Sequence, residues 1–126
     1  MTSFIIVDPD VQSSIELKKL LNGYAALDFQ GSCTTLGAAE ESIRGHPPDV
    51  AFIRFEKAEL NAFRLADELK RANPVSRIIF TGSRRESAVD AFEYEVDGFL
   101  LIPFDKGAVD KLVRSFEIVK KDTRKL

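Results

Sequence analysis

Short runs of apolar residues alternate along the chain with stretches in which apolar residues recur every three or four positions. Continuous runs of β-branched and aromatic residues are typical of strands buried on both faces. The runs, one of them weaker and placed only approximately, are Phe4–Val7, about Ala26–Thr34, Val50–Ile53, Ile78–Thr81 and Gly98–Ile102. We therefore expect five strands.

The stretches between the runs carry the periodicity of amphipathic helices. Helix-breaking residues mark several of the C-terminal ends, since Gly23, Gly45 and Pro74 each follow a stripe. Asp10 is placed to cap the N-terminus of the first helix. The last helix is expected to give way to the polar tail from Lys120 onward. The stripes run, in chain order, through Val11, Ile15, Leu17, Leu20, Leu21 and Tyr24, about Leu36–Arg44, then Leu60, Phe63, Ala66 and Leu69, then Ala88, Val89, Ala91, Phe92 and Val96, and finally Val109, Leu112, Val113, Phe116 and Val119.

Five strands that alternate with five helices predict an α/β fold. Right-handed crossovers between parallel strands place helices on both faces of one sheet, which is a doubly wound arrangement of the flavodoxin-like kind. In such folds the functional site lies at the carboxyl ends of the strands, near the switch in strand order. The 126 residues suit a single domain, expected over residues 1–121, with 122–126 as a polar tail or the start of a linker.

Composition narrows the classes of function. The formal net charge is −2, without the basic excess of a domain that holds nucleic acid on its own surface, so no direct nucleic-acid binding is expected. One cysteine, Cys33, excludes an internal disulfide, and one histidine, His46, leaves too few ligands for a zinc site. Cys33 is interpreted as a small buried hydrophobe and His46 as an exposed loop residue. The apolar runs are too short to span a membrane, and no signal peptide is recognised, so a cytoplasmic location is expected.

The strand ends carry the candidate chemistry. Two acids close in sequence after the first strand could hold Mg²⁺ through oxygen ligands. The alternative is that Asp10 only caps the following helix and Asp8 only accepts hydrogen bonds in the turn. Thr81 could equally belong to an ordinary turn. The candidates at this edge are Asp8, Asp10, Arg54, Thr81, Ile102 and Pro103.

The whole chain resembles the receiver domain of two-component response regulators, the CheY-like superfamily. The segments that carry the resemblance are Phe4–Asp8, Pro48–Arg54, Ile78–Gly82 and Val96–Phe104, the last being the most specific. The segment Ala91-Phe92-Glu93 resembles the corresponding segment of receivers that are attached to LytTR-type DNA-binding domains. The resemblance implies the strand order 2-1-3-4-5 and a phosphorelay function in which a histidine kinase transfers a phosphoryl group to an aspartate beside Mg²⁺.

The sequence departs from that family at the residues of phosphotransfer. The second acid of the usual pair falls on Pro9, the phosphoacceptor aspartate falls on Arg54, and the lysine that contacts the phosphoryl group falls on Ile102. Asp8, Thr81 and Pro103 keep the family identity. The resemblance therefore implies a degenerate pseudo-receiver with a vestigial phosphorylation pocket, no catalytic residues, no bound metal and no cofactor.

Arg54 is the informative residue of this pocket. Its guanidinium stands where a metal and a lysine normally neutralise the acids, and we expect it to fork onto the carboxylate of Asp8. The alternative is that Arg54 points from a loop into water. Glu56 and Glu59, which follow nearby, are interpreted as solvated acids.

The favoured hypothesis is a non-enzymatic signalling module that works through protein contacts without phosphorylation. The resemblance implies partners such as an effector domain, a histidine kinase or a second copy, with a homodimer expected through the fourth helix, fifth strand and fifth helix. For each charged residue of that face, ordinary solvation is the competing interpretation. The candidate face consists of Arg84, Arg85, Glu86, Phe99, Lys106, Lys111 and Arg114.

Two other hypotheses remain open from the sequence. The first is a phosphotransfer switch with a substitute acceptor such as Asp8, Asp10 or Ser83. The second is a flavin or nucleotide binder on the same fold, which is disfavoured because Asp8-Pro9-Asp10 offers carboxylates where a phosphate needs backbone N–H groups and glycine.

Overall fold

The computed structural model describes residues 1–125, with side chains to Phe116. The strands are β1 (Thr2–Val7), β2 (Leu27–Cys33), β3 (Val50–Arg54), β4 (Arg77–Gly82) and β5 (Gly98–Leu101). The helices are α1 (Val11–Leu21), α2 (Leu36–Gly45), α3 (Ala62–Ala72), α4 (Arg85–Glu93) and α5 (Lys106–Lys125), with a 3₁₀ turn at Ala58–Leu60 before α3. The expectation that the last helix gives way to a polar tail from Lys120 is wrong, because α5 continues to Lys125. The domain boundary at residue 121 stays a prediction.

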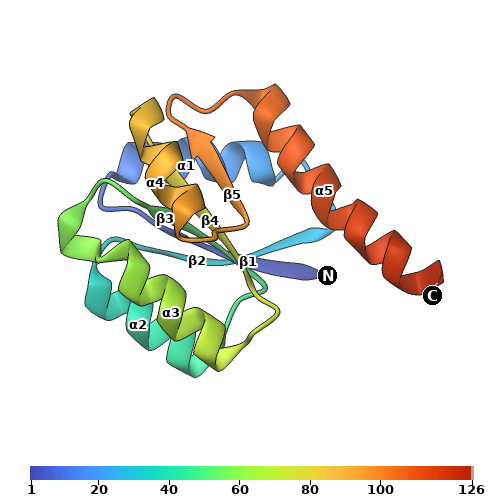
Figure 1. Cartoon of the computed structure of the whole chain (residues 1–126), viewed down its shortest axis with the longest axis horizontal. Coiled ribbons are helices and arrows are strands. Elements are labelled where there is room, and N and C mark those ends of the chain that lie inside the picture. Colours follow the sequence, from blue (N-terminus) through green and yellow to red (C-terminus); the bar gives the residue numbers. More distant parts are fainter. Residues whose placement is uncertain (126) are drawn as a thin grey trace.

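All five strands pair in parallel in the order β2-β1-β3-β4-β5, and the chain folds as a flavodoxin-like, doubly wound sheet (Figure 1). The predicted fold class and strand order are confirmed. Helices cover both faces, which explains why the central strands read as unbroken apolar runs. None of the helices in the described part of the chain has the length and apolar character needed to cross a bilayer.

Each face of the sheet has its own hydrophobic core, and alternate residues of one strand feed the two cores. In β1, Phe4 and Ile6 pack in a cluster with side chains of α1 and α5. Ile5 and Val7 pack in the other cluster, with side chains of α2, α3 and α4. A one-residue slip of β1 would exchange the two sets, so this alternation fixes the register against its neighbours.

Asp10 caps α1 as the sequence predicts. Its carboxylate accepts hydrogen bonds from the backbone N–H groups of Gln12 and Ser13 and from the Ser13 hydroxyl. The cap supplies acceptors for donors that the first turn of a helix cannot satisfy internally. It also directs the Asp10 side chain toward α1.

Three of the predicted apolar stripes are only partly buried, and in the α3 stripe the exposed residue is Phe63. On α4, Val89 is 62% and Phe92 54% exposed, because the helix rests on the sheet through the small residues Ser87 and Ala91. On α1, Ile15 is likewise exposed while two serines of the helix are buried. Small side chains let a helix approach the sheet closely, and the larger apolar ones then point outward.

Candidate functional site

The carboxyl ends of the central strands bring the predicted pocket residues to one edge of the sheet. In the strand register Val7 pairs with Ile53, and Arg54 pairs with Thr81. Asp8 follows β1 directly, so it lies beside Arg54. Asp8, Arg54 and Thr81 are all buried.

Arg54 contacts Asp8, as the sequence predicts. Its Nη1 donates a hydrogen bond to Asp8 Oδ2 at 3.1 Å, and both side chains are less than one tenth exposed. The other oxygen of Asp8 accepts from the backbone N–H of Asp10 at 2.8 Å. The alternative in which Arg54 points into water is therefore wrong. The expected two-pronged fork onto Asp8 is also absent, because Arg54 Nε faces a different carboxylate.

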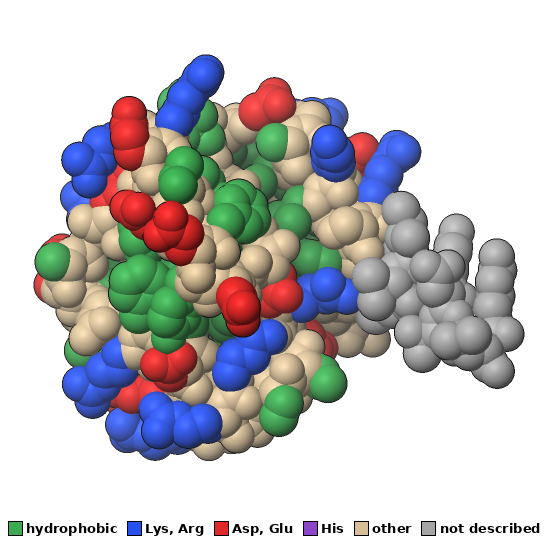
Figure 2. Space-filling model, viewed as in Figure 1, with side chains coloured by type: hydrophobic (Ala, Val, Ile, Leu, Met, Phe, Trp, Pro, Cys, Tyr) green, Lys and Arg blue, Asp and Glu red, His purple; other side chains and the backbone are tan. Residues whose placement is uncertain are grey.

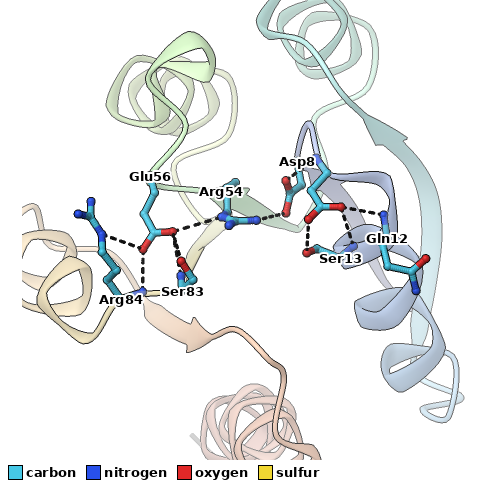
Figure 3. A network of polar contacts seen from close by, with 8 residues as sticks. Asp8, Gln12, Ser13, Arg54, Glu56, Ser83 and Arg84 are labelled. Atoms are coloured by element: carbon cyan, nitrogen blue, oxygen red, sulfur yellow. Dashed lines mark hydrogen bonds and ion pairs between the residues drawn. The ribbon is translucent and has the colours of Figure 1, made fainter.

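That carboxylate belongs to Glu56, whose Oε1 lies 3.5 Å from Arg54 Nε (Figure 3). The prediction that Glu56 is a solvated acid is wrong, since its side chain is only 9% exposed. Glu59, by contrast, is exposed as expected. A guanidinium flanked by two buried carboxylates joins the ends of β1 and β3 into one polar network.

Four hydrogen bonds hold Glu56 on its other side. Oε1 accepts from the backbone N–H of Ser83 at 2.8 Å and from the Ser83 hydroxyl at 2.9 Å. Oε2 accepts from the backbone N–H of Arg84 at 2.8 Å and from the Ser87 hydroxyl at 3.1 Å. The Arg84 guanidinium adds a longer contact, with Nε 3.7 Å from Oε2. Glu56 thus ties the end of β3 to the β4–α4 loop and to the first turn of α4.

These contacts fix the charge state of Glu56. Burial by itself would raise the pKa of this carboxyl, but the hydrogen bonds from Ser83, Arg84 and Ser87 outweigh burial and lower the pKa to about 2. Hydrogen bonds to a carboxylate stabilise its charged form. Glu56 is therefore an anion throughout the neutral range.

Two features of the β4–α4 region accommodate Glu56, and neither one by itself identifies Glu56 from the sequence. The residue before α4 is Arg84, whose side chain makes no capping hydrogen bond, so the first turn needs an acceptor from elsewhere. Gly82 is the second feature, because a Cβ at that position would lie 2.9 Å from Glu56 Oε2. The absence of a side chain at Gly82 allows the carboxylate to approach the loop.

The other predicted pocket residues lie at the same edge with different contacts. Asp10 is directed to Ser13, whose side-chain hydrogen bond is the main cause of a lowered pKa at Asp10. The backbone carbonyl of Thr81 accepts from the N–H of Phe55 at 2.8 Å. Ile102 follows β5, is half-buried and brings an apolar side chain, and a cis peptide bond joins it to the exposed Pro103.

Metal-ligating side chains do not gather in the part of the chain that the structure describes. No three of its histidine, cysteine, aspartate and glutamate residues stand close enough together to hold a metal ion. At the strand ends, a guanidinium separates the two buried acids Asp8 and Glu56.

The candidate interaction face is charged and solvent-facing, with apolar residues among its charges. Phe99 differs from the others, since it is half-buried and packs against the core on the α3 and α4 side. Apolar and acidic side chains are interspersed over α4 (Figure 2), where Val89 and Phe92 are exposed. The exposed charged residues of the predicted face are Arg84, Arg85, Glu86, Lys106, Lys111 and Arg114.

Comparison with known sequences finds relatives among response regulators. No model of a known protein family matches the chain. The sensory transduction protein LytT of Bacillus anthracis is 26% identical over 93% of this chain and 48% of its own length. An uncharacterised response regulatory protein of Yersinia pestis is 29% identical over 100% of this chain and 54% of its own length. The chain thus spans about half the length of the curated relatives it matches.

Solved structures share the fold. The response regulatory domain of MrkE from Klebsiella pneumoniae superposes with a TM-score of 0.82 at 21% identity, covering 95% of this chain and 98% of that domain. The chain therefore has the fold of a response regulatory domain.

Proposed function

We propose that this chain, a CheY-like response-regulator receiver domain by its relatives and its fold, signals through protein contacts without accepting a phosphoryl group. It is a two-component signalling module in which the phosphotransfer pocket is vestigial. The vestigial pocket comprises Asp8, Asp10, Arg54, Thr81, Ile102 and Pro103. In this proposal the module has no enzymatic activity and needs no metal.

The buried Arg54–Asp8 contact carries the proposal. A guanidinium has no oxygen to receive a phosphoryl group, and here it already neutralises the acid that remains from the family's pair. Ile102 supplies no ammonium to stabilise the charge that develops during transfer. The acceptor aspartate, the second acid and the lysine are therefore replaced, and the remaining acid, Asp8, is already paired.

The test is incubation of the protein with a small-molecule phosphodonor and Mg²⁺, followed by intact mass measurement. The proposal expects no added phosphoryl mass under conditions that fully modify an ordinary receiver run in parallel. A stoichiometric mass increase mapped to Asp8, Asp10 or Ser83 would instead establish a substitute acceptor and overturn the proposal.

The partner surface that we propose is α4, β5 and the first turns of α5. Val89 and Phe92 on α4 and Leu101 on β5 are exposed apolar residues among charged ones, a composition that suits a protein interface. Partners of this class include an effector domain, a histidine kinase or a second copy of the chain. The similarity to LytT-named proteins favours a LytTR-type regulator. Our proposal also places the protein in the cytoplasm and takes residues 1–121 as the receiver domain, with 122–126 as a tail or linker.

Analytical ultracentrifugation tests the second-copy version of this surface. Phe92→Ser should weaken or abolish a dimer, because Phe92 is an exposed apolar residue of α4 in the proposed face. Val75→Ser is the matched control, since Val75 is even more exposed but lies in the loop before β4. Equal effects of the two variants on self-association would rule out this face.

A further inference from the structure

The Glu56 carboxylate lies in a cradle of donors that come from three segments of the chain. Arg54 stands at the end of β3, Ser83 and Arg84 belong to the β4–α4 loop, and Ser87 belongs to the first turn of α4. Figure 3 shows the side chains of Arg54 and Arg84 on opposite sides of the carboxylate, with Ser83 below it. An anion at this point therefore connects elements that are distant in sequence.

Two independent observations make this cradle an anion site. The first is the start of α4, a nine-residue helix, where two backbone N–H groups point at one carboxylate and the helix dipole favours negative charge. The second is the Nε of Arg54, a buried donor without a hydrogen-bond acceptor, which faces Glu56 Oε1 at 3.5 Å. The Arg54 side chain is only 8% exposed. Its guanidinium and the backbone N–H groups at the start of α4 thus converge on the same Glu56 carboxylate.

We propose that Arg54, Ser83, Arg84 and Ser87 form an oxyanion site that the chain fills with its own Glu56 carboxylate. This internal anion holds the β4–α4 loop and the start of α4 in one conformation. This inference rests on the proposed function, which is signalling without phosphorylation. It explains how the α4 surface is kept in one conformation, because the anion that orders this surface comes from within the chain and needs no kinase.

The chemistry of the donors sets the class of ligand. Two backbone N–H groups and one guanidinium edge can only donate, and the hydroxyls of Ser83 and Ser87 donate to the same carboxylate. The site therefore presents donors and a positive charge, and it selects an oxyanion such as a carboxylate or inorganic phosphate. Glu56 blocks this position in the native chain. Removal of its side chain beyond Cβ leaves the donors in place and opens the position to an anion from solution.

The experiment is chemical complementation of Glu56→Ala with inorganic phosphate at constant ionic strength. At ten times the dissociation constant, phosphate should shift the unfolding equilibrium of this variant about tenfold beyond any general salt effect. The melting temperature should rise by roughly 4 °C as a result. Glu59→Ala is the matched control, because Glu59 is an exposed acid of the same loop. The Glu59→Ala variant and the native chain both report the general effect of phosphate on stability.

Hydrogen exchange at the Ser83 and Arg84 amides gives a local readout. Both amides should exchange faster in Glu56→Ala and regain protection when phosphate is added. A phosphate shift no larger than that of Glu59→Ala, or unchanged protection of the two amides, would overturn the proposal.

Gly82→Ala covers the case in which Glu56→Ala does not fold. This variant keeps every charge but places a methyl group 2.9 Å from Glu56 Oε2 and 3.0 Å from Phe99 Cζ. This variant should lose hydrogen-exchange protection at the Ser83 and Arg84 amides, and retained protection would contradict the proposal.

The phosphodonor experiment tests the proposed function separately from the anion site. Phosphorylation of the native chain would overturn the proposed function and leave phosphate complementation standing. Failed complementation without phosphorylation would overturn only the anion site.

Discussion

At the scale of single residues, Arg54 is buried with a carboxylate on either side. Its Nη1 contacts Asp8 and its Nε faces Glu56, so one cation neutralises two acids at the ends of β1 and β3. The two acids are not equally dependent on it. Glu56 has four further hydrogen bonds, whereas Asp8 has one further bond, from the Asp10 backbone.

Asp8→Asn should destabilise the protein by roughly 3 kcal/mol, because it removes one partner of a buried ion pair. The double change Asp8→Asn with Arg54→Met should recover much of this loss, since both members of the pair leave together. Arg54→Met alone should be worse than Asp8→Asn, because it leaves two buried acids without their cation. Urea unfolding of the three variants and the native chain measures the coupling, and simple additivity would show that the pair is not coupled.

Glu56 should make folding sensitive to acid. Its pKa in the folded protein is about 2, below the ordinary value of 4.5, so the unfolded chain binds more protons between these pH values. The stabilisation from Glu56 is complete above pH 4.5 and is lost as pH falls toward 2. Its size is at most about 3 kcal/mol.

Urea unfolding at a series of pH values tests this dependence. Glu56→Gln should lose less stability than the native chain on acidification across that interval, because it has no carboxyl to protonate. Glu59→Gln, at an exposed acid, should follow the native profile. Parallel profiles for the native chain and Glu56→Gln would refute the assignment.

At the scale of elements, α4 depends on its neighbours more than on its own sequence. It has no side-chain cap of its own and takes its anion from the β3–α3 loop. It contacts the sheet through Ser87 and Ala91, and its larger apolar residues face outward. Tyr94, just after α4, hydrogen-bonds Asp67 of α3, and burial together with this contact raises the pKa of Tyr94 to about 12.

Ala91→Leu should therefore destabilise the protein by about 1–3 kcal/mol. Ala91 is fully buried on the face of α4 that packs against the sheet, and a larger side chain there forces the helix away from the sheet. Ala88→Leu on the same helix is the control, since Ala88 is half-buried, and it should cost less. Thermal or urea unfolding compares the two. A loss from Ala88→Leu as large as that from Ala91→Leu would contradict this packing argument.

At the scale of the whole molecule, the fold is shared with a solved response regulatory domain. The strand order is β2-β1-β3-β4-β5, and each face of the sheet has its own core. A guanidinium, a proline and an isoleucine occupy three positions at which the resemblance implies acids and a lysine. The fold does not depend on those three positions, because both cores are built from other residues.

Arg54→Asp should not restore phosphorylation. The new carboxylate would stand beside Asp8 and Glu56 without the second acid lost at Pro9 or an ammonium at Ile102, and the three carboxylates would repel one another. Incubation with a phosphodonor and Mg²⁺, read by intact mass, checks this expectation. Modification as complete as that of an ordinary receiver would show that our account of the pocket is wrong.

Mg²⁺ should bind the native chain more weakly than about 1 mM, which corresponds to about −4 kcal/mol. The reason is that Arg54 already neutralises Asp8 and Pro9 supplies no carboxylate ligand. Isothermal titration measures this affinity. A specific, saturable Mg²⁺ site tighter than that limit would contradict the prediction.

The sequence by itself determined the α/β class, the alternation of strands and helices, the Asp10 cap and the contact between Arg54 and Asp8, because these depend on local periodicity and on which residues end adjacent parallel strands. Only the tertiary structure decided the role of Glu56. Its four donors come from residues 27 to 31 positions away along the chain, and no local pattern carries that pairing. The outward turn of Val89 and Phe92 was likewise decided by packing, since a helical stripe shows which residues share a face but not whether small neighbours bring a different face against the sheet.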